Sequence, residues 1–156
     1  MNFVYSDLRP RNPYLNLALD EAMAQEMGGQ ADFRAGLRLW ANPECVVLGR
    51  TCDISANLQP ASLAGQVISQ RRSAWKKQTT IARRVSGGGT VLHGPGNINY
   101  SIFLNMKHFP GLYNVRRSYE VILGMIVRSL QKQGLQVAMA GLSDLMVEGS
   151  PGRKIS

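Results

Sequence analysis

The sequence contains only two cysteines, Cys45 and Cys52, which are too few for a disulfide framework or a four-ligand zinc site. Long apolar segments are also missing. The longest run, Val121–Val127, has seven residues even with Gly124 counted, whereas a membrane-spanning helix needs about 20. Residues Met1–Tyr14 carry charges and no apolar segment typical of a secretory signal. These absences predict a reduced, cytoplasmic protein without a membrane span.

Acidic residues are absent between Asp53 and Glu120, a stretch that holds nine of the 18 lysines and arginines. The whole chain has 10 acidic residues, so its formal charge is +8. Such a block favours an anionic partner, for example a nucleotide phosphate, a nucleic acid, an acidic protein or a carboxylate substrate. A solvated basic surface gives the same pattern, so the charge alone leaves both interpretations open.

The order of the expected elements predicts an α/β (α+β) domain with a mixed, mainly antiparallel β-sheet flanked by helices. A strand is expected at 2–7, followed by a helix that Asn12 caps, Pro13 begins and Gly28-Gly29 ends. The apolar stripe of this helix consists of Leu15, Ala18, Leu19, Ala22 and Met23. The β-rich runs 37–41 and 45–50 surround an Asn-Pro turn and are expected to pair with each other.

The second half of the chain predicts a similar mixture of elements. Residues 51–80 are polar and irregular, as in a long surface connection, and 81–105 form a strand, a glycine loop and further strands. A helix ending at Gly134 is indicated by the stripe Tyr119, Ile122, Leu123, Ile126, Val127 and Leu130. Residues 135–140 and 143–149 resemble two strands paired around Gly141, and 152–156 the start of another strand.

The glycine-rich segment 83–97, RRVSGGGTVLHGPGN, is the sharpest feature of the sequence. Five of the 16 glycines fall between positions 87 and 96. Adjacent glycines let backbone N–H groups approach an anion, and Arg83 and Arg84 supply positive charge. The segment matches neither the P-loop nor the dinucleotide-binding pattern. A simple hairpin turn needs only one or two glycines, so the spacing favours a ligand loop.

This segment resembles the signature of the lipoate-protein ligases, in the wider fold group of biotin-protein ligases and octanoyl transferases. The similar stretches are ARRVSGGGTVLHGPGNINYSIF (82–103), NLALDEAM (16–23), LRLWANPECVVLGR (37–50) and SDLMVEGSPGRKIS (143–156). The resemblance implies that ATP and lipoate, or octanoate, form an acyl-AMP and release pyrophosphate. A lysine of an acceptor lipoyl domain then attacks this anhydride to form an amide.

The resemblance also implies site residues. The ATP or adenylate would contact Arg84, Ser86, Gly87, Gly88, Gly89, Thr90, Val91, Leu92, His93, Asn97, Asp144 and Lys154. The lipoyl group would contact Leu17, Trp40, Arg84, Gly88, His93 and Lys154. Lys154 would be the catalytic residue, Mg²⁺ would accompany ATP near Asp144, and no other metal is implied. Each residue also has an ordinary interpretation, with Trp40 in the core, His93 in a turn and Lys154 on the surface.

Family members continue beyond the catalytic lysine. We therefore expect residues 1–156 to be the N-terminal part of a single catalytic domain, incomplete at its C-terminus and without an accessory domain, and its activity alone to be low. A second polypeptide could supply the remainder. The implied acceptors are the lipoyl domains of 2-oxoacid dehydrogenase complexes or the glycine cleavage H protein.

Two alternatives stay open. An octanoyl or lipoyl transferase of the same fold would need an acyl-carrier donor and an activated cysteine. Neither Cys45 nor Cys52 matches such a nucleophile, but one could follow Ser156. A nucleic-acid-binding module is the second alternative, because Trp75 lies among Arg71, Arg72, Lys76 and Lys77. No nucleic-acid signature accompanies them, so this alternative is disfavoured.

Overall fold

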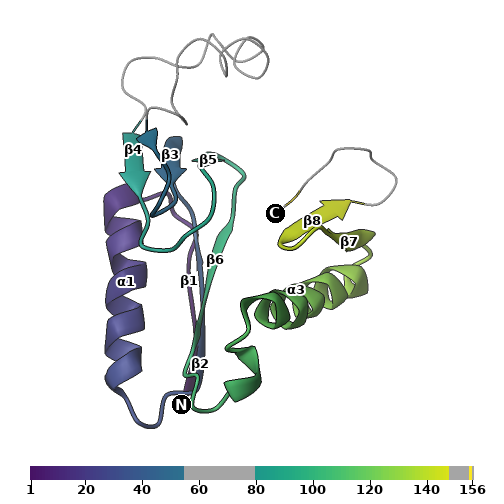
Figure 1. Cartoon of the computed structure of the whole chain (residues 1–156). Helices are drawn as coiled ribbons and strands as arrows, with labels where there is room; N and C mark the ends of the chain where they lie inside the picture. The colour runs from purple at the N-terminus through teal and green to yellow at the C-terminus, as the bar shows by residue number, and fades with distance from the viewer. Residues whose placement is uncertain (55–79, 148–154, 156) are drawn as a thin grey trace. The chain divides into compact units, whose positions relative to one another are not determined.

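The computed structural model describes residues 1–54, 80–147 and 155. The chain divides into two compact units, Met1–Leu104 and Asn105–Ser156 (Figure 1). Most of the surface connection expected at 51–80 lies outside the described residues. No helix in the described ranges is long and apolar enough to cross a membrane.

The first unit contains a sheet in the order β1-β2-β6. Strand β1 (Asn2–Asp7) is parallel to β2 (Ala35–Trp40), and β6 (Asn99–Leu104) is antiparallel to β2. Along β2 every second residue is buried, namely Gly36, Arg38 and Trp40. This alternation places one charged side chain on the buried face of the central strand, between a glycine and a tryptophan.

Helix α1 (Pro13–Gly29) begins where the sequence predicts, because the Asn12 side chain accepts hydrogen bonds from the Tyr14 and Leu15 N–H groups. The predicted apolar stripe is only partly right. Leu19 and Met23 are half-buried, but Leu15, Ala18 and Ala22 are exposed. The buried residues are Pro13 and Asn16, and Leu17 and Asp20 are half-buried. The buried Arg38 of β2 needs polar partners, and α1 supplies them by turning Asn16 and Asp20 toward the sheet.

The end of α1 agrees with the prediction. The helix ends at Gly29, and the N–H of the following Gln30 donates to the Met27 carbonyl at 3.2 Å.

A second sheet of this unit has the order β4-β3-β5. Strand β3 (Cys45–Leu48) is buried along its whole length, parallel to β4 (Thr80–Arg83) and antiparallel to β5 (Val91–His93). The expected pairing of 37–41 with 45–50 is therefore wrong, because β2 and β3 belong to different sheets. Asn42 between them is buried and hydrogen-bonded to Asn16, which makes this segment a crossover between sheets instead of a turn.

The second unit contains the 3-10 helix η2 (Pro110–Leu112), α3 (Val115–Lys132), β7 (Val137–Ala140) and β8 (Asp144–Val147). Strands β7 and β8 are antiparallel around Gly141, as predicted. The core of this unit includes Leu123, Val137 and Leu145, each at most 2% exposed. Tyr119 is 38% exposed and falls outside the buried stripe predicted for α3.

The end of α3 agrees with the sequence, since Gly134 has a positive φ of 86° directly after the Gln133 cap. Beyond β8, the Ile155 N–H donates to the Leu145 carbonyl at 2.8 Å. The rest of the strand expected at 152–156 lies outside the described residues.

The predicted fold class is confirmed. The described strands form two parallel pairs and three antiparallel pairs, so the sheets are mixed and mainly antiparallel. Two α-helices accompany them.

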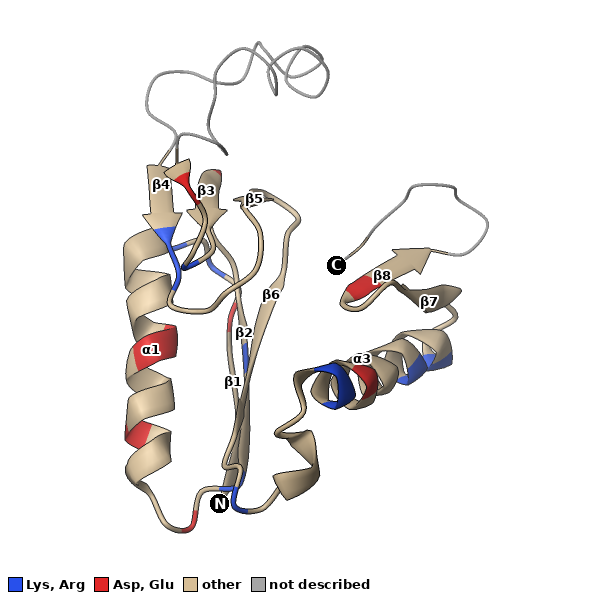
Figure 2. Ribbon diagram, viewed as in Figure 1, with Lys and Arg blue, Asp and Glu red and all other residues tan. Residues whose placement is uncertain are grey.

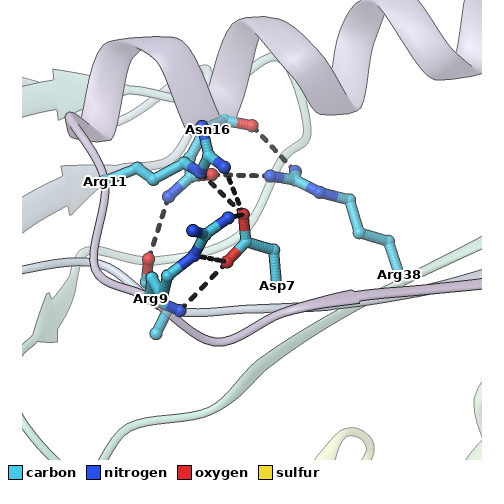
Figure 3. A network of polar contacts seen from close by, with 6 residues as sticks. Asp7, Arg9, Arg11, Asn16 and Arg38 are labelled. Carbon is cyan, nitrogen blue, oxygen red and sulfur yellow. Dashed lines mark hydrogen bonds and ion pairs between the residues drawn. The ribbon is translucent and has the colours of Figure 1, made fainter.

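The end of β1 carries a pH-sensitive cluster, shown in Figure 3. Asp7 accepts hydrogen bonds from Arg9 Nε at 3.0 Å and from Arg11 Nε at 2.8 Å. The guanidinium of Arg9, and then that of Arg11, hold the pKa of Asp7 well below its ordinary value of 3.8. Stability from this cluster is therefore present above the unfolded-state pKa and is lost as the pH falls through 3.8 and below.

We expect Asp7→Asn to remove this acid-sensitive part of the stability. The loss of unfolding free energy relative to the wild type should be constant above about pH 5 and should shrink in more acidic solution, where Asp7 loses its charge in the unfolded state first. Urea titrations at several pH values measure this difference. Asp32→Asn, at an exposed carboxylate of the same unit, is the control. A difference for Asp7→Asn that is the same at every pH would contradict the prediction.

Candidate functional site

The glycine loop, residues 84–90, lies between β4 and β5 and is held against the end of β3. The Arg84 N–H donates to the Leu48 carbonyl at 3.0 Å, and the Arg50 N–H donates to the Ser86 carbonyl at 2.9 Å. These two bonds continue the pairing of β3 with the chain that follows β4. The position of the loop is therefore set by backbone bonds at its start.

The carbonyl groups of the loop face Arg84 and Cys52. Arg84 Nη2 donates to the carbonyls of Gly87 at 2.8 Å and Gly89 at 2.9 Å, and Cys52 Sγ donates to that of Gly88 at 3.3 Å. The described peptide bonds are all trans, so each N–H points opposite to the carbonyl of its own peptide unit. The Gly88 N–H therefore points away from Arg84, and the Gly89 N–H points away from Cys52. Adjacent N–H groups of a glycine loop can bind an anion.

Two glycines are required where the loop meets β3. A Cβ atom on Gly49 would lie 1.9 Å from the Gly88 carbonyl oxygen, which is far inside van der Waals contact. Gly88 itself has a φ of 95°, a conformation that side chains disfavour. By contrast, a Cβ on Gly87 or Gly89 would meet no atom within 4 Å. The loop is packed tightly on the side of Gly49 and is open at Gly87 and Gly89.

Both arginines before the loop donate to backbone carbonyls. Arg83 Nη1 lies 2.8 Å from the Gly49 carbonyl oxygen, 3.1 Å from that of Arg50 and 2.7 Å from that of Cys52. Figure 2 shows positive residues in blue where β4 ends. The sequence predicts direct countercharge from Arg83 and Arg84. The structure instead directs their hydrogen bonds to the carbonyl side of the loop, so they shape the loop and raise its positive potential from there.

His93, at the end of β5, lies near the loop. Its pKa is lowered, first because burial disfavours the imidazolium ion and second because the positive charge of Arg84 repels it. The imidazole Nδ1 lies 3.0 Å from Asn42 Nδ2, and the ring contacts Trp40 edge to face with centroids 6.0 Å apart. These contacts hold the His93 ring in place, and its lowered pKa favours the neutral imidazole.

A buried polar network lies between α1 and the first sheet. Arg38, which is 1% exposed, donates to the Asn16 carbonyl at 2.9 Å and to Asn16 Oδ1 at 2.6 Å, and it forms an ion pair with Asp20. Figure 3 shows Asn16 and Arg38 pointing toward one another. Asp20 also accepts from Ser101 Oγ at 2.6 Å, and Ser101 accepts from Trp40 Nε1 at 2.9 Å. The network thus reaches from the helix to Trp40.

Trp40 is 5% exposed, and its ring centroid lies 4.9 Å from the Arg38 guanidinium carbon. This buried position is compatible with the predicted contact to the lipoyl group and also with an ordinary role in the core. Leu17 is half-buried on α1.

The other predicted site residues differ in their exposure and position. Ser86, Val91, Leu92 and Asn97 are exposed, and Thr90 is half-buried. Asp144 is half-buried on β8 in the second unit, and Lys154 lies outside the described residues. The first unit thus brings together Trp40, His93 and the loop around Arg84. Roles of these residues toward a ligand stay predictions.

The sequence analysis missed Asn16, Asp20, Arg38 and Asn42. Signals for three of them were present in the sequence. Arg38 lies two positions from Trp40 on a strand, so both side chains share one face, and Asn16 and Asp20 are four residues apart on a helix. The burial of Asn42 had no such signal.

Comparisons with known proteins support one family. The model of the lipoyl protein ligase A/B catalytic domain matches residues 12–156. Lipoate-protein ligase A of Blochmanniella floridana is 28% identical over 155 residues, which is 93% of this chain and 37% of that protein. The chain spans 37–45% of the length of the three curated relatives compared.

Solved structures share the fold. A bi-partite lipoate protein ligase from Thermoplasma acidophilum has a TM-score of 0.66 and 20% identity, covering 98% of this chain and 52% of that chain. A lipoate-protein ligase A bound with ATP has a TM-score of 0.62 and 20% identity, covering 94% of this chain and 56% of that one. Over nearly its whole length, then, the chain belongs to the lipoyl protein ligase A/B catalytic domain family.

Proposed function

We propose that this chain carries the acyl-adenylate site of an ATP-dependent lipoate-protein ligase. The observation that carries the proposal is the glycine loop, in which the Gly88 N–H points away from Arg84 and the Gly89 N–H points away from Cys52. The family assignment and the ATP-bound structure of a relative support a nucleotide phosphate as the anion.

The proposed reaction has two steps. A carboxylate oxygen of lipoate or octanoate attacks the α-phosphorus of ATP, and the bond to pyrophosphate breaks. The amine of an acceptor lysine then attacks the acyl carbon, loses a proton and displaces AMP. Both steps develop negative charge on oxygen, which preorganised N–H donors stabilise without reorganisation. Gly88 and Gly89 supply such donors, and by resemblance Lys154 supplies a cation that touches the acyl and phosphate groups.

Mg²⁺ is proposed to enter the site with ATP. No cluster of three or more His, Cys, Asp or Glu side chains occurs within 1–54, 80–147 and 155. Mg²⁺ commonly binds through nucleotide phosphates, water and only one or two carboxylates, so the ion would arrive with ATP. Asp144 stays the candidate carboxylate, and the ion would neutralise phosphate charge.

The transferase alternative finds little support in the described cysteines. Cys45 is fully buried, and this burial raises the pKa of its thiol, which is the opposite of activation. Cys52 donates to the Gly88 carbonyl and helps to hold the loop. The basic cluster around Trp75 of the nucleic-acid alternative lies outside the described residues.

The proposed partners follow from the family. The T. acidophilum relative is a bi-partite lipoate protein ligase that belongs to a lipoylation system with an E2 lipoyl domain. We propose the same class of acceptor here, either the lipoyl domains of 2-oxoacid dehydrogenase complexes or the glycine cleavage H protein. A second polypeptide that completes the site and a cytoplasmic location are part of this proposal.

The test is exchange of labelled pyrophosphate into ATP by the full protein. Exchange should require lipoate or octanoate, because the carboxylate is the attacking group. A parallel assay supplies octanoyl carrier protein without ATP and follows acyl transfer to a lipoyl domain. Exchange that needs no carboxylic acid, or transfer only from the carrier protein, would overturn the ligase function.

A further inference from the structure

Arg38 fixes the direction of a chain of hydrogen bonds that ends at His93. A guanidinium group can donate hydrogen bonds but cannot accept them, and it keeps its charge at any ordinary pH. Arg38 Nη2 lies 2.6 Å from Asn16 Oδ1, so this oxygen is the acceptor. Asn16 Nδ2 must then be the donor to the Ala41 carbonyl at 2.9 Å and to Asn42 Oδ1 at 2.8 Å.

The same reasoning continues through Asn42. Since Asn42 Oδ1 accepts from Asn16, the group 3.0 Å from His93 Nδ1 is the Asn42 NH₂ donor. His93 Nδ1 must accept this bond, which leaves the proton of a neutral imidazole on Nε2. Reversing the Asn42 amide would bring two NH₂ groups within 2.8 Å of each other. If the Asn16 amide were reversed as well, its NH₂ group would face the Arg38 guanidinium, and both of these groups are donors.

We propose that Arg38, Asn16 and Asn42 form a relay that holds His93 in its neutral tautomer with the proton on Nε2. His93 would thereby present a permanent hydrogen-bond donor, without the charge of an imidazolium ion. Asn16 and Asn42 are positioning residues, because they act on the site through His93.

The surroundings of His93 favour the same state. The charged group that acts on it directly is Arg84, whose positive charge opposes an imidazolium ion. Cys45, its partner across β3 and β5, is a buried thiol. Asp20 is bound to Arg38 and Ser101. Trp40 contacts the ring by its edge.

This tautomer has a consequence that rests on the proposed function. A neutral Nε2–H suits an oxygen of the acyl carboxylate or of its adenylate, because it donates a bond without protonating the acid. An imidazole with its proton on Nδ1 would present a lone pair there and would repel the same oxygen. The relay would therefore select oxygen acceptors at this position.

The first test is nuclear magnetic resonance of the full protein with ¹⁵N-labelled histidine. The sequence has two histidines, and His93→Gln and His108→Gln assign their signals. We expect His93 to show an acceptor Nδ1 and a protonated Nε2 near neutral pH. A proton on His93 Nδ1, or a mixture of both tautomers of His93, would overturn the relay.

The second test reverses the relay. Asn42→Asp is nearly isosteric and still accepts from Asn16, but it presents a carboxylate oxygen to His93. The proton should move to Nδ1, and the pKa of His93 should rise by about 1 to 3 pH units, as beside an opposite charge. Asn12→Asp is the matched control. Aspartate also caps helices, and position 12 lies away from His93 in the sequence. An unchanged His93 spectrum in folded Asn42→Asp would contradict the relay.

The ligand side is tested separately, with a stable analogue of lipoyl-AMP added to the wild-type protein. The His93 Nε2–H signal should shift on binding. Binding without such a shift would show that His93 does not contact the ligand. The spectrum of the free protein would still test the relay. Absence of pyrophosphate exchange would overturn the ligase function and leave the tautomer measurement intact.

Discussion

Gly49→Ala is expected to lower lipoate-dependent pyrophosphate exchange by about 100-fold in the full protein, the usual cost of misplacing reacting groups by about 1 Å. The new Cβ would lie 1.9 Å from the Gly88 carbonyl oxygen, and this contact must open by more than 1 Å to become tolerable. Gly49 is buried in the chain that follows β3, so the glycine loop is the part that moves. The bonds of Arg84 to the Gly87 and Gly89 carbonyls would be lost with it.

The effect should be larger on activity than on stability. Overpacking of this kind costs about 1 to 3 kcal/mol, which urea titration measures in the same samples. Gly124→Ala on α3 is the control, since its Cβ meets only Arg128 at an ordinary 3.5 Å. Alanine there should stabilise the helix by up to about 1 kcal/mol and leave exchange unchanged. Wild-type exchange by a folded Gly49→Ala protein would disprove the importance of this close approach.

Asp20→Asn is expected to lower the free energy of unfolding by about 3 kcal/mol, the lower end of the range for breaking a buried ion pair. The side chain of Arg38 is 1% exposed, so its charge cannot be solvated once its partner is neutral. The lower end applies because the Asp20 side chain retains 22% exposure. The amide of the variant could still bond to Ser101 or Arg38, but it would not balance the guanidinium charge.

Glu21→Gln provides the matched control for this prediction. It makes the same change from carboxylate to amide at the next position of α1, where the side chain is exposed. Its effect should stay within about 0.5 kcal/mol, as for most surface substitutions. Urea titration of the wild type and both variants makes the comparison. Equal stabilities for Asp20→Asn and Glu21→Gln would show that the Asp20–Arg38 pair contributes no more than a surface charge.

Local sequence signals predicted the elements well where the cause was local. Asn12 caps its helix with its own side chain, and Gly134 supplies the positive φ after α3. The hairpin of β7 and β8 around Gly141 follows from neighbouring residues in the same way. The glycine loop was also recognisable, because its composition exceeds what a turn requires. Each of these features depends on contacts between residues a few positions apart.

Contacts between distant residues decided the rest. The face that α1 buries was mispredicted. The apolar pattern of the helix contains no information about Arg38, which lies on a strand 22 positions after Asn16 and binds it. The pairing of β2 with β6, and of β3 with β4 and β5, depends on segments that the sequence separates by a long connection. The orientation of Arg84 toward the loop carbonyls could not be predicted from the sequence either. Its positive charge predicts attraction to an anion, but it does not show that backbone carbonyls lie nearer.

The sequence by itself therefore determined the family, the mixed fold and the loop that would bind an anion. Only the tertiary structure decided which way the loop faces, why Gly49 must be glycine, and which nitrogen of His93 carries the proton. The physical reason is that a hydrogen bond inside a protein has a direction, set by all the donors and acceptors around it. That set comes together only when α1, β2 and β5 fold against one another, and no local pattern along the chain contains it.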